Sequence, residues 1–232
     1  MGVDLSFLVR SLAEQATPEP GTDLLRLPTE RELVASLDIS RGTLREQLSM
    51  LEMLGFLTRT QGRGSYLGVP DSSFIQLYFD LSSELGQLGG GQFRSAREML
   101  EISMTEAAAR LATADDVDVL RGLVDEMVRA SAAGEDERAL EADLDFHRHL
   151  CTVVNNPIFT LLHDGLSHVL RDEVVDRRRI AVEREPLRPG ENRVIDTVHY
   201  GIVDAVENRD GEGARSAMRH HFEVWSSLTG EA

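Results

Sequence analysis

Apolar residues in the first third of the chain recur at helical spacing, which predicts two short helices separated by a tight turn. The first helix carries Leu33 and Leu37 on one side. After the turn, the second carries Leu44, Leu48 and Leu51 at the same kind of spacing. Each helix therefore has one face that can be buried and another that remains exposed to solvent.

The starts of both helices have capping residues. Thr29 and Glu32 have the spacing of a capping box, in which the hydroxyl accepts an N–H and the carboxylate reaches back. Ser40 can cap the second helix. The polar face of this second helix carries side chains that can bond to phosphates or base edges, namely Arg41, Thr43, Arg45 and Gln47.

Two short β-like runs follow, at 56–60 and 65–67, on either side of Gln61-Gly62-Arg63-Gly64. A glycine-rich hairpin with an arginine at its tip suits entry into a narrow groove. Together with the two helices it predicts a winged helix-turn-helix whose second helix reads DNA. The plainer alternative is a pair of amphipathic helices followed by a surface hairpin.

The rest of the chain predicts helices only. A short helix is expected at 5–15 and another at 74–85, and 86–92, with three consecutive glycines, is expected to form a flexible joint. Helices follow at 94–113, 116–133, 137–154, 157–182, 190–208 and 211–228. The predicted fold is mainly α: a winged helix-turn-helix at 1–70, a linker at 71–93, and an all-α antiparallel bundle at 94–232.

Composition agrees with this division. The net charge is −16, but residues 1–70 hold 7 arginines against 9 acidic residues, whereas 71–232 hold 17 against 31. The acidity can therefore point away from DNA. A single cysteine, Cys151, rules out a disulfide within the chain and is consistent with a reducing cytoplasm. No apolar run is long enough to span a bilayer, so no membrane partner is expected.

Three segments resemble the signature of the GntR family of bacterial transcription regulators: 27–33, 40–48 and 62–64. Thr29 replaces the family's usual serine and keeps the capping hydroxyl. The resemblance implies that operator DNA is contacted by Arg31, Arg41, Arg45 and the wing from Gly62 through Arg63 to Gly64.

All seven histidines of the chain lie in the predicted bundle. Asp143 and His147 lie at positions i and i+4 of one helix and can project to one point. His199 lies on a later helix and His220-His221 on the last, so three imidazoles and one carboxylate can form a divalent metal site. His149 is expected to face away, and two further histidines, His163 and His168, are expected to be ordinary helix residues.

Residues 94–222 are similar to the ligand-binding domain of the FadR subgroup of GntR regulators. In many of its members an Asp-x-x-x-His helix and two later histidines hold a metal, and the matching positions are Asp143, His147, His199 and His221. His220 is the rival for the last position. Zinc, nickel and manganese are all compatible with this ligand set.

Four protein ligands on a six-coordinate metal leave two positions for water or a chelating carboxylate. Arg97, one turn before Glu101, resembles the Arg-x-x-x-Glu of the subgroup's first helix and could pair with an acid ligand. Its alternative role is a salt bridge to Glu101 alone.

The sequence therefore predicts a transcription regulator that binds a near-palindromic operator in double-stranded DNA as a homodimer and responds to a small carboxylate metabolite. Two alternatives remain: a metal-dependent enzyme using the same Asp and His residues, and a DNA-binding regulator whose metal is purely structural.

Overall fold

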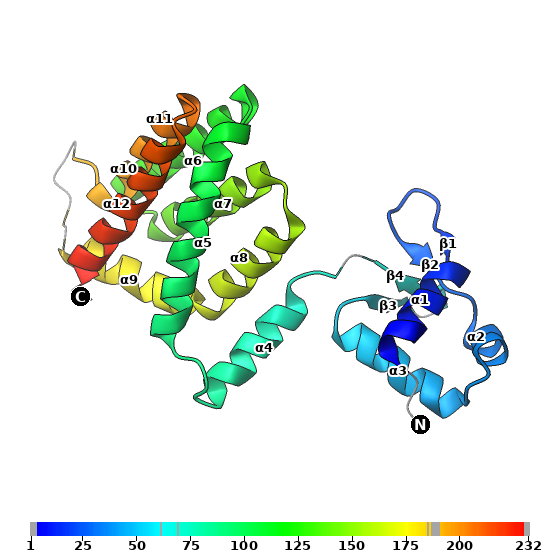
Figure 1. The fold of residues 1–232 in the computed structure, drawn as a ribbon. Coiled ribbons are helices and arrows are strands. Elements are labelled where there is room, and N and C mark those ends of the chain that lie inside the picture. The colour runs from blue at the N-terminus through cyan, green and yellow to red at the C-terminus, as the bar shows by residue number, and fades with distance from the viewer. Residues whose placement is uncertain (1–3, 61, 69, 185, 187–190, 230–232) are drawn as a thin grey trace. The chain divides into compact units, whose positions relative to one another are not determined.

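The computed structural model describes residues 4–60, 62–68, 70–184, 186 and 191–229 (Figure 1). The chain divides into two compact units between Leu77 and Tyr78, and each is described by itself. The fold is mainly α, with a small winged helix-turn-helix unit and an all-helical unit, and the predicted fold class is confirmed.

The N-terminal unit is built from three helices, α1 (Leu5–Gln15), α2 (Glu30–Leu37) and α3 (Arg41–Met53). Their apolar faces meet in one core whose central members are Leu8, Leu12, Leu33, Leu44 and Leu48. The predicted caps are present. Thr29 and Glu32 form a complete capping box at α2, and Ser40 accepts a hydrogen bond from the N–H of Thr43 at α3.

A four-stranded antiparallel sheet closes this unit, with strand order β1-β2-β4-β3. The predicted hairpin is formed by β3 (Leu57–Thr60) and β4 (Gly64–Leu67). β1 (Thr17–Pro18) and β2 (Leu25–Arg26) lie in a stretch without strand-like alternation, and the sequence did not predict them. β2 exists because its backbone pairs with β4, a partner about forty residues away whose position only the fold provides.

The segment between the wing and the bundle contains α4 (Ser73–Glu84), after which α5 runs from Gly90 to Leu111. The expected flexible joint at 86–92 is therefore wrong in its second half, because Gly90 and Gly91 lie inside α5. The side chain of Gln92 accepts a hydrogen bond from the N–H of Gly89 at 2.6 Å, which fixes the start of the helix. Gly86 has a positive φ of 65° and marks the turn that remains.

The helical unit continues with α6 (Ala114–Ala133), α7 (Asp136–Val154), α8 (Pro157–Val169) and α9 (Arg171–Arg184). The short α10 (Val194–Thr197) precedes α11 (His199–Glu207) and α12 (Gly211–Thr229).

Two of the predicted bundle helices differ from the structure. The helix expected at 157–182 is interrupted at Leu170, whose buried side chain packs with Phe93 of α5 and Leu166. The helix expected at 190–208 begins only at Val194 and is divided at Val198. Residues 187–190 lie outside the described residues.

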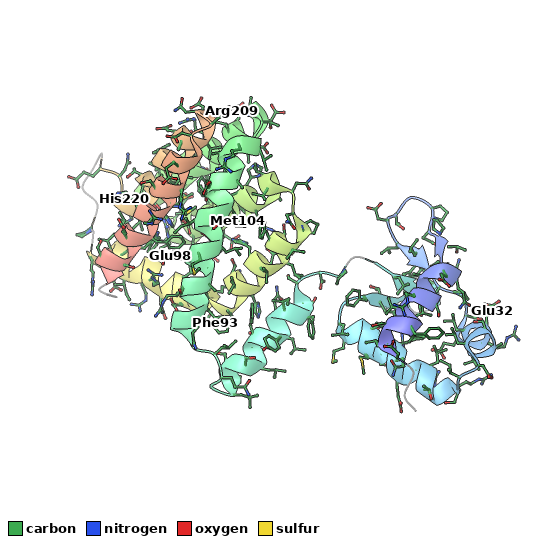
Figure 2. The ribbon with its side chains drawn as sticks, viewed as in Figure 1. Glu32, Phe93, Glu98, Met104, Arg209 and His220 are labelled. Carbon is green, nitrogen blue, oxygen red and sulfur yellow. The ribbon has the colours of Figure 1, made fainter. Side chains whose placement is uncertain are left out.

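α5 runs through the helical unit and packs against α7, α8, α11 and α12 (Figure 1). Met104 lies midway along it (Figure 2) and is fully buried, as are Phe146 of α7 and Met218 of α12. This packing brings side chains from three separate helices to one buried point. Within the described ranges, every helix is too short or too polar to cross a membrane.

Candidate metal centre and nucleic-acid interface

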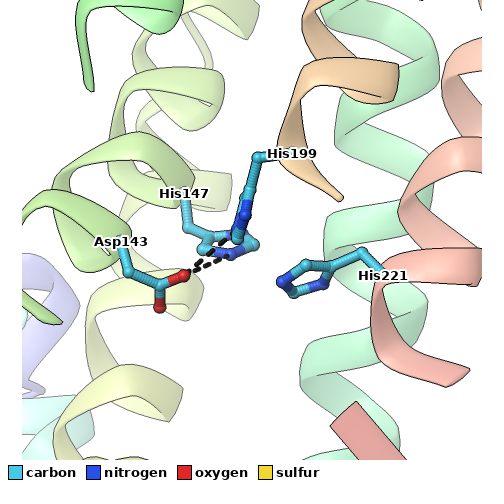
Figure 3. A group of neighbouring side chains, drawn as sticks. All are labelled: Asp143, His147, His199 and His221. Carbon is cyan, nitrogen blue, oxygen red and sulfur yellow. Dashed lines mark ion pairs between the residues drawn. The ribbon is translucent and has the colours of Figure 1, made fainter. Parts of the chain in front are cut away.

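Four buried side chains from three helices converge in the helical unit. Asp143 and His147 lie one turn apart on α7, His199 is the first residue of α11, and His221 lies on α12. Their nearest ligand atoms all lie within 4.8 Å of one another (Figure 3). The packing of α5 against α7, α11 and α12 has brought these four residues together.

One oxygen of Asp143 faces two of the three imidazoles. Its Oδ1 is 3.1 Å from Nε2 of His199 and 4.0 Å from Nε2 of His147 (Figure 3). Burial opposes ionisation of Asp143, but its contact with His199 and the nearby charge of His147 outweigh burial. They hold the pKa of the Asp143 carboxyl well below its usual range. Asp143 is therefore a buried anion.

The outer nitrogens of two imidazoles face hydrogen-bond acceptors. Nδ1 of His147 is 2.8 Å from Oε2 of Glu101, and Nδ1 of His199 is 3.0 Å from the carbonyl oxygen of Asp196. A carbonyl and an ionised carboxylate can only accept hydrogen bonds, so each Nδ1 faces a group to which it can donate. Nε2 of each ring then faces Asp143, and it is the nitrogen that a metal would take as its ligand. Carboxylate and carbonyl partners orient metal-binding histidines in this way.

This donor set fits a cation. Among the described residues, Asp143 Oδ1 and Nε2 of His147 and His199 take part in no hydrogen bond, although they are buried. A buried imidazole nitrogen and a buried carboxylate oxygen 3.1 Å apart need a proton or a cation between them. A cavity of about 30 Å³ lies beside them, lined by Arg97, Asp143, His147 and His221 among others, and is large enough for an ion or a water molecule.

The two candidates for the last ligand are separated by the fold. His221 is buried, and burial together with the charges of His199 and His147 lowers its pKa well below the ordinary value. His220, the next residue, is 66% exposed and lies 3.7 Å from Glu223 (Figure 2). His149 also lies outside the group, 3.2 Å from Asp116.

Glu101 of α5 connects the histidine cluster to a second buried network. It accepts a hydrogen bond from Nε of Arg97 at 2.6 Å, contacts His147, and lies 3.5 Å from Nε2 of His163. Burial would raise the pKa of Glu101, but the charges of Arg97 and His147 lower it well below its usual range. The Glu101 carboxylate therefore contacts three side chains that can donate to it, those of Arg97, His147 and His163.

His163 corrects one expectation from the sequence, because it is not an ordinary helix residue. It is almost fully buried on α8. Burial favours its neutral form, but Asp164, Cys151 and Glu101 together raise the pKa of His163 to about 11. The sequence did not predict this role. Asp164 is adjacent to His163, but Cys151 and Glu101 lie on other helices and at no spacing that points to His163. His168, the other histidine expected to be an ordinary helix residue, is exposed and lies 3.0 Å from Asp80.

A second cavity, of about 260 Å³, is lined by Arg97 and shares it with the smaller one. Arg94 and Arg177 also line it, as do the acidic residues Glu98 and Glu173. Arg94 pairs with Glu173 at 2.9 Å. Arg97 is paired with Glu101, so an anion in this space would be an additional partner for guanidinium groups that already have one.

In the other unit, the residues expected to read DNA lie at the start of α3. Arg41 and Arg45 are exposed, whereas the Thr43 hydroxyl is 2.9 Å from that of Ser40 and takes part in the cap. Arg31 is exposed on α2. Nε of Arg45 is paired with Oε2 of Glu30 at 3.0 Å, so a DNA contact through this nitrogen would have to replace this partner.

The wing tip has a defined backbone. Gly62 and Gly64 have φ values of 76° and 130°, which residues with a Cβ rarely adopt. The carbonyl oxygen of Arg63 accepts hydrogen bonds from Nη2 of Arg26 at 3.2 Å and from the hydroxyl of Tyr66 at 3.3 Å. These two hydrogen bonds fix the backbone of the turn that carries the exposed Arg63 side chain. Sequence reasoning missed Arg26 because this contact spans the sheet.

Comparison with known families gives two matches that together cover most of the chain. Residues 92–224 match the FCD domain, and residues 18–67 match the family described as bacterial regulatory proteins, gntR family. The first match includes all four clustered residues, and the second includes α2, α3 and the wing.

Two similar proteins are both HTH-type transcriptional repressors named NanR. The protein of Citrobacter rodentium is 29% identical over 210 residues, covering 88% of this chain and 78% of its own length. The protein of Cronobacter sakazakii is 28% identical over 210 residues with the same coverage. A solved structure described as Streptococcus agalactiae GntR has a TM-score of 0.60 at 24% identity, covering 95% of this chain and 97% of its own, and is similar in fold.

Proposed function

The chain belongs to the gntR family of bacterial regulatory proteins with an FCD domain, and from this premise we propose how it is controlled. It is a transcription regulator, and the enzyme that the sequence left open is not adopted, because the matched families and relatives are regulators. The proposal has three parts: operator recognition by residues 1–70, a divalent metal at the Asp and His cluster, and a small carboxylate metabolite as the effector.

Operator recognition is assigned to α3 and the wing. Arg41, Thr43 and Arg45 lie in the first turns of α3, and in helix-turn-helix proteins this part of the reader helix enters the major groove. Arg63, with Gly62 and Gly64 beside it, is proposed to enter the adjacent minor groove. Arg31, at the start of α2, is proposed to contact phosphate.

The metal is assigned to Asp143, His147, His199 and His221. The observation that carries this assignment is that two imidazole nitrogens, Nε2 of His147 and of His199, face one ionised, buried carboxylate oxygen. Glu101 and the Asp196 carbonyl support it, since each holds a ring in the orientation that leaves Nε2 facing inward. When bound, a divalent ion would supply a Lewis-acidic centre with positions open to an acid.

The effector is assigned to the space next to this centre. A carboxylate at the open positions would lie beside Arg97, which lines both cavities and keeps its bond to Glu101 through Nε. Arg97 can therefore hold Glu101 and face an anion at the same time, which combines the two roles considered for it. Arg94 and Arg177 extend the positive lining into the cavity of about 260 Å³.

Control of DNA binding requires the helical domain at 94–232 to act on the reader helices. We assign the segment at 71–93, with α4 and the turn at Gly86, as the connection, and the helical domain as the site of homodimerisation. A two-fold dimer would meet a near-palindromic operator with one reader helix in each half-site. An effector that binds two arrangements of the dimer unequally shifts their populations and thereby the operator affinity.

The test is operator binding by the full chain with and without metal and acid. An operator selected in vitro is titrated with chelator-treated protein, metal-loaded protein, and loaded protein with each of a panel of small carboxylic acids. We expect at least one acid to change the operator affinity of the loaded protein only. His221→Ala should abolish this response, and His220→Ala, its exposed neighbour, should retain it. Tight metal binding without any acid response would favour a purely structural metal.

A further inference from the structure

The only tryptophan of the chain is hydrogen-bonded to one of the four clustered residues. The indole Nε1 of Trp225 donates to Nε2 of His221 at 3.1 Å, and the two residues lie one turn apart on α12. Both are buried. The Trp225 ring also packs below the guanidinium of Arg177, whose Cζ is 5.9 Å from the ring centroid.

This hydrogen bond determines where the proton of His221 lies. An indole N–H can only donate, so Nε2 of His221 has to be the acceptor, and the proton of the neutral ring lies on Nδ1. A ring that accepts at Nε2 and keeps its proton on Nδ1 is neutral. The lone pair of His221 is therefore directed at Trp225.

Ligation of a metal through either nitrogen breaks this bond. If Nε2 is the ligand, its single lone pair is no longer available to the indole. If Nδ1 is the ligand, the proton moves to Nε2, and two N–H groups then face each other. In both cases Trp225 loses His221 as its acceptor. The hydrogen bond is lost whichever nitrogen of His221 faces the metal.

We propose that Trp225 competes with the metal for His221, so that metal loading and release of the indole from His221 are one event. This inference rests on the metal site proposed above and assigns a role to a residue outside the four ligands. Trp225 lines the cavity of about 30 Å³ together with Arg97 and Arg177. Loading therefore changes the wall of the space in which the effector is proposed to bind, and the competition lowers the metal affinity of the site.

Tryptophan fluorescence can follow the competition, since Trp225 is the sole tryptophan and all tryptophan emission comes from it. Zinc is the suitable probe because its closed d shell has no redox chemistry. Chelator-treated full-length protein is titrated with zinc. Tryptophan emission is expected to change and to saturate at one zinc per chain. His221→Ala should show no zinc response, and His220→Ala should respond as the parent does.

The affinity is measured separately, by competition with a chromophoric chelator. Trp225→Phe keeps an aromatic ring but lacks the N–H, so zinc should bind roughly two- to twelve-fold more tightly, the factor expected for removal of one competing hydrogen bond. Circular dichroism of the variant checks that it folds, and the parent's emission supplies a readout that needs no variant.

The outcomes separate this inference from the proposed function. A parent that takes up one zinc with unchanged emission, or a folded Trp225→Phe protein with equal or weaker zinc affinity, overturns the competition and leaves the metal site standing. A parent that takes up no divalent metal by elemental analysis overturns both. An emission change in the parent together with tighter binding by Trp225→Phe supports the inference.

Discussion

Replacing Glu30 by Gln is expected to strengthen operator binding, because Glu30 occupies a side chain that DNA needs. Nε of Arg45 lies 3.0 Å from Oε2 of Glu30, and the two side chains are 70% and 38% exposed. Arg45 cannot keep this carboxylate partner and also bond to a phosphate or a base edge through the same N–H. In the free protein Arg45 is therefore held in an ion pair with Glu30, and operator binding through the same N–H would have to break this ion pair.

The size of the effect follows from this exposure. Exposed ion pairs contribute about 0.2–1 kcal/mol and are screened by salt. Removal of the Arg45–Glu30 ion pair should tighten operator binding by at most about five-fold at low salt and by less at physiological ionic strength. Arg45→Ala should cost about 1–3 kcal/mol of specific binding, since it removes the contact itself.

Fluorescence anisotropy with a selected operator measures all variants at two salt concentrations. Glu14→Gln is the matched control, because it removes one negative charge from an exposed position on α1 of the same unit. In the Arg45→Ala background, Glu30→Gln should have no effect beyond that of Glu14→Gln. If Glu30→Gln binds operator no more tightly than Glu14→Gln when Arg45 is present, the competition is refuted.

Three further predictions concern the helical unit and the assembly. His199→Ala should lower the metal content measured by elemental analysis, whereas His149→Ala should not, because His149 lies outside the group beside Asp116; equal metal in both variants would reject the site. A carboxylic acid at about a hundred times its dissociation constant should stabilise the metal-loaded protein by about 2.7 kcal/mol, and thermal unfolding should show no such gain after chelator treatment. Sedimentation on operator DNA should show two chains per near-palindromic site, and a single chain would contradict the two-fold arrangement.

The helix starts of this protein were predictable because the responsible contacts are local. Thr29 bonds to Glu32 three residues away, and the hydroxyl of Ser40 reaches the N–H of Thr43. The glycines of the wing required only a turn of known type. The break at Leu170 was not predictable, since it comes with the packing of that side chain against Phe93 of another helix.

Within the candidate site, the sequence by itself determined one pair of neighbours. Asp143 and His147 share a face of α7 because residues four apart always do. Spacing could not choose between His220 and His221, which point about 100° apart on any helix, and the family resemblance was needed for that choice. The fold makes the same choice physically, by burying His221 beside His147 of α7 and His199 of α11 and leaving His220 exposed.

Only the tertiary structure decided the surroundings of these residues. Glu101 was visible in the sequence as a neighbour of Arg97, but its contacts with His147 and His163 depend on how α5 packs against α7 and α8. The same is true of Glu30 and Arg45, which lie on different helices. The chain thus determined its helices, its wing and the types of its ligands by local chemistry. The orientation of each lone pair and the partner of each charge required contacts between residues far apart in the sequence, which exist only once the helices have packed.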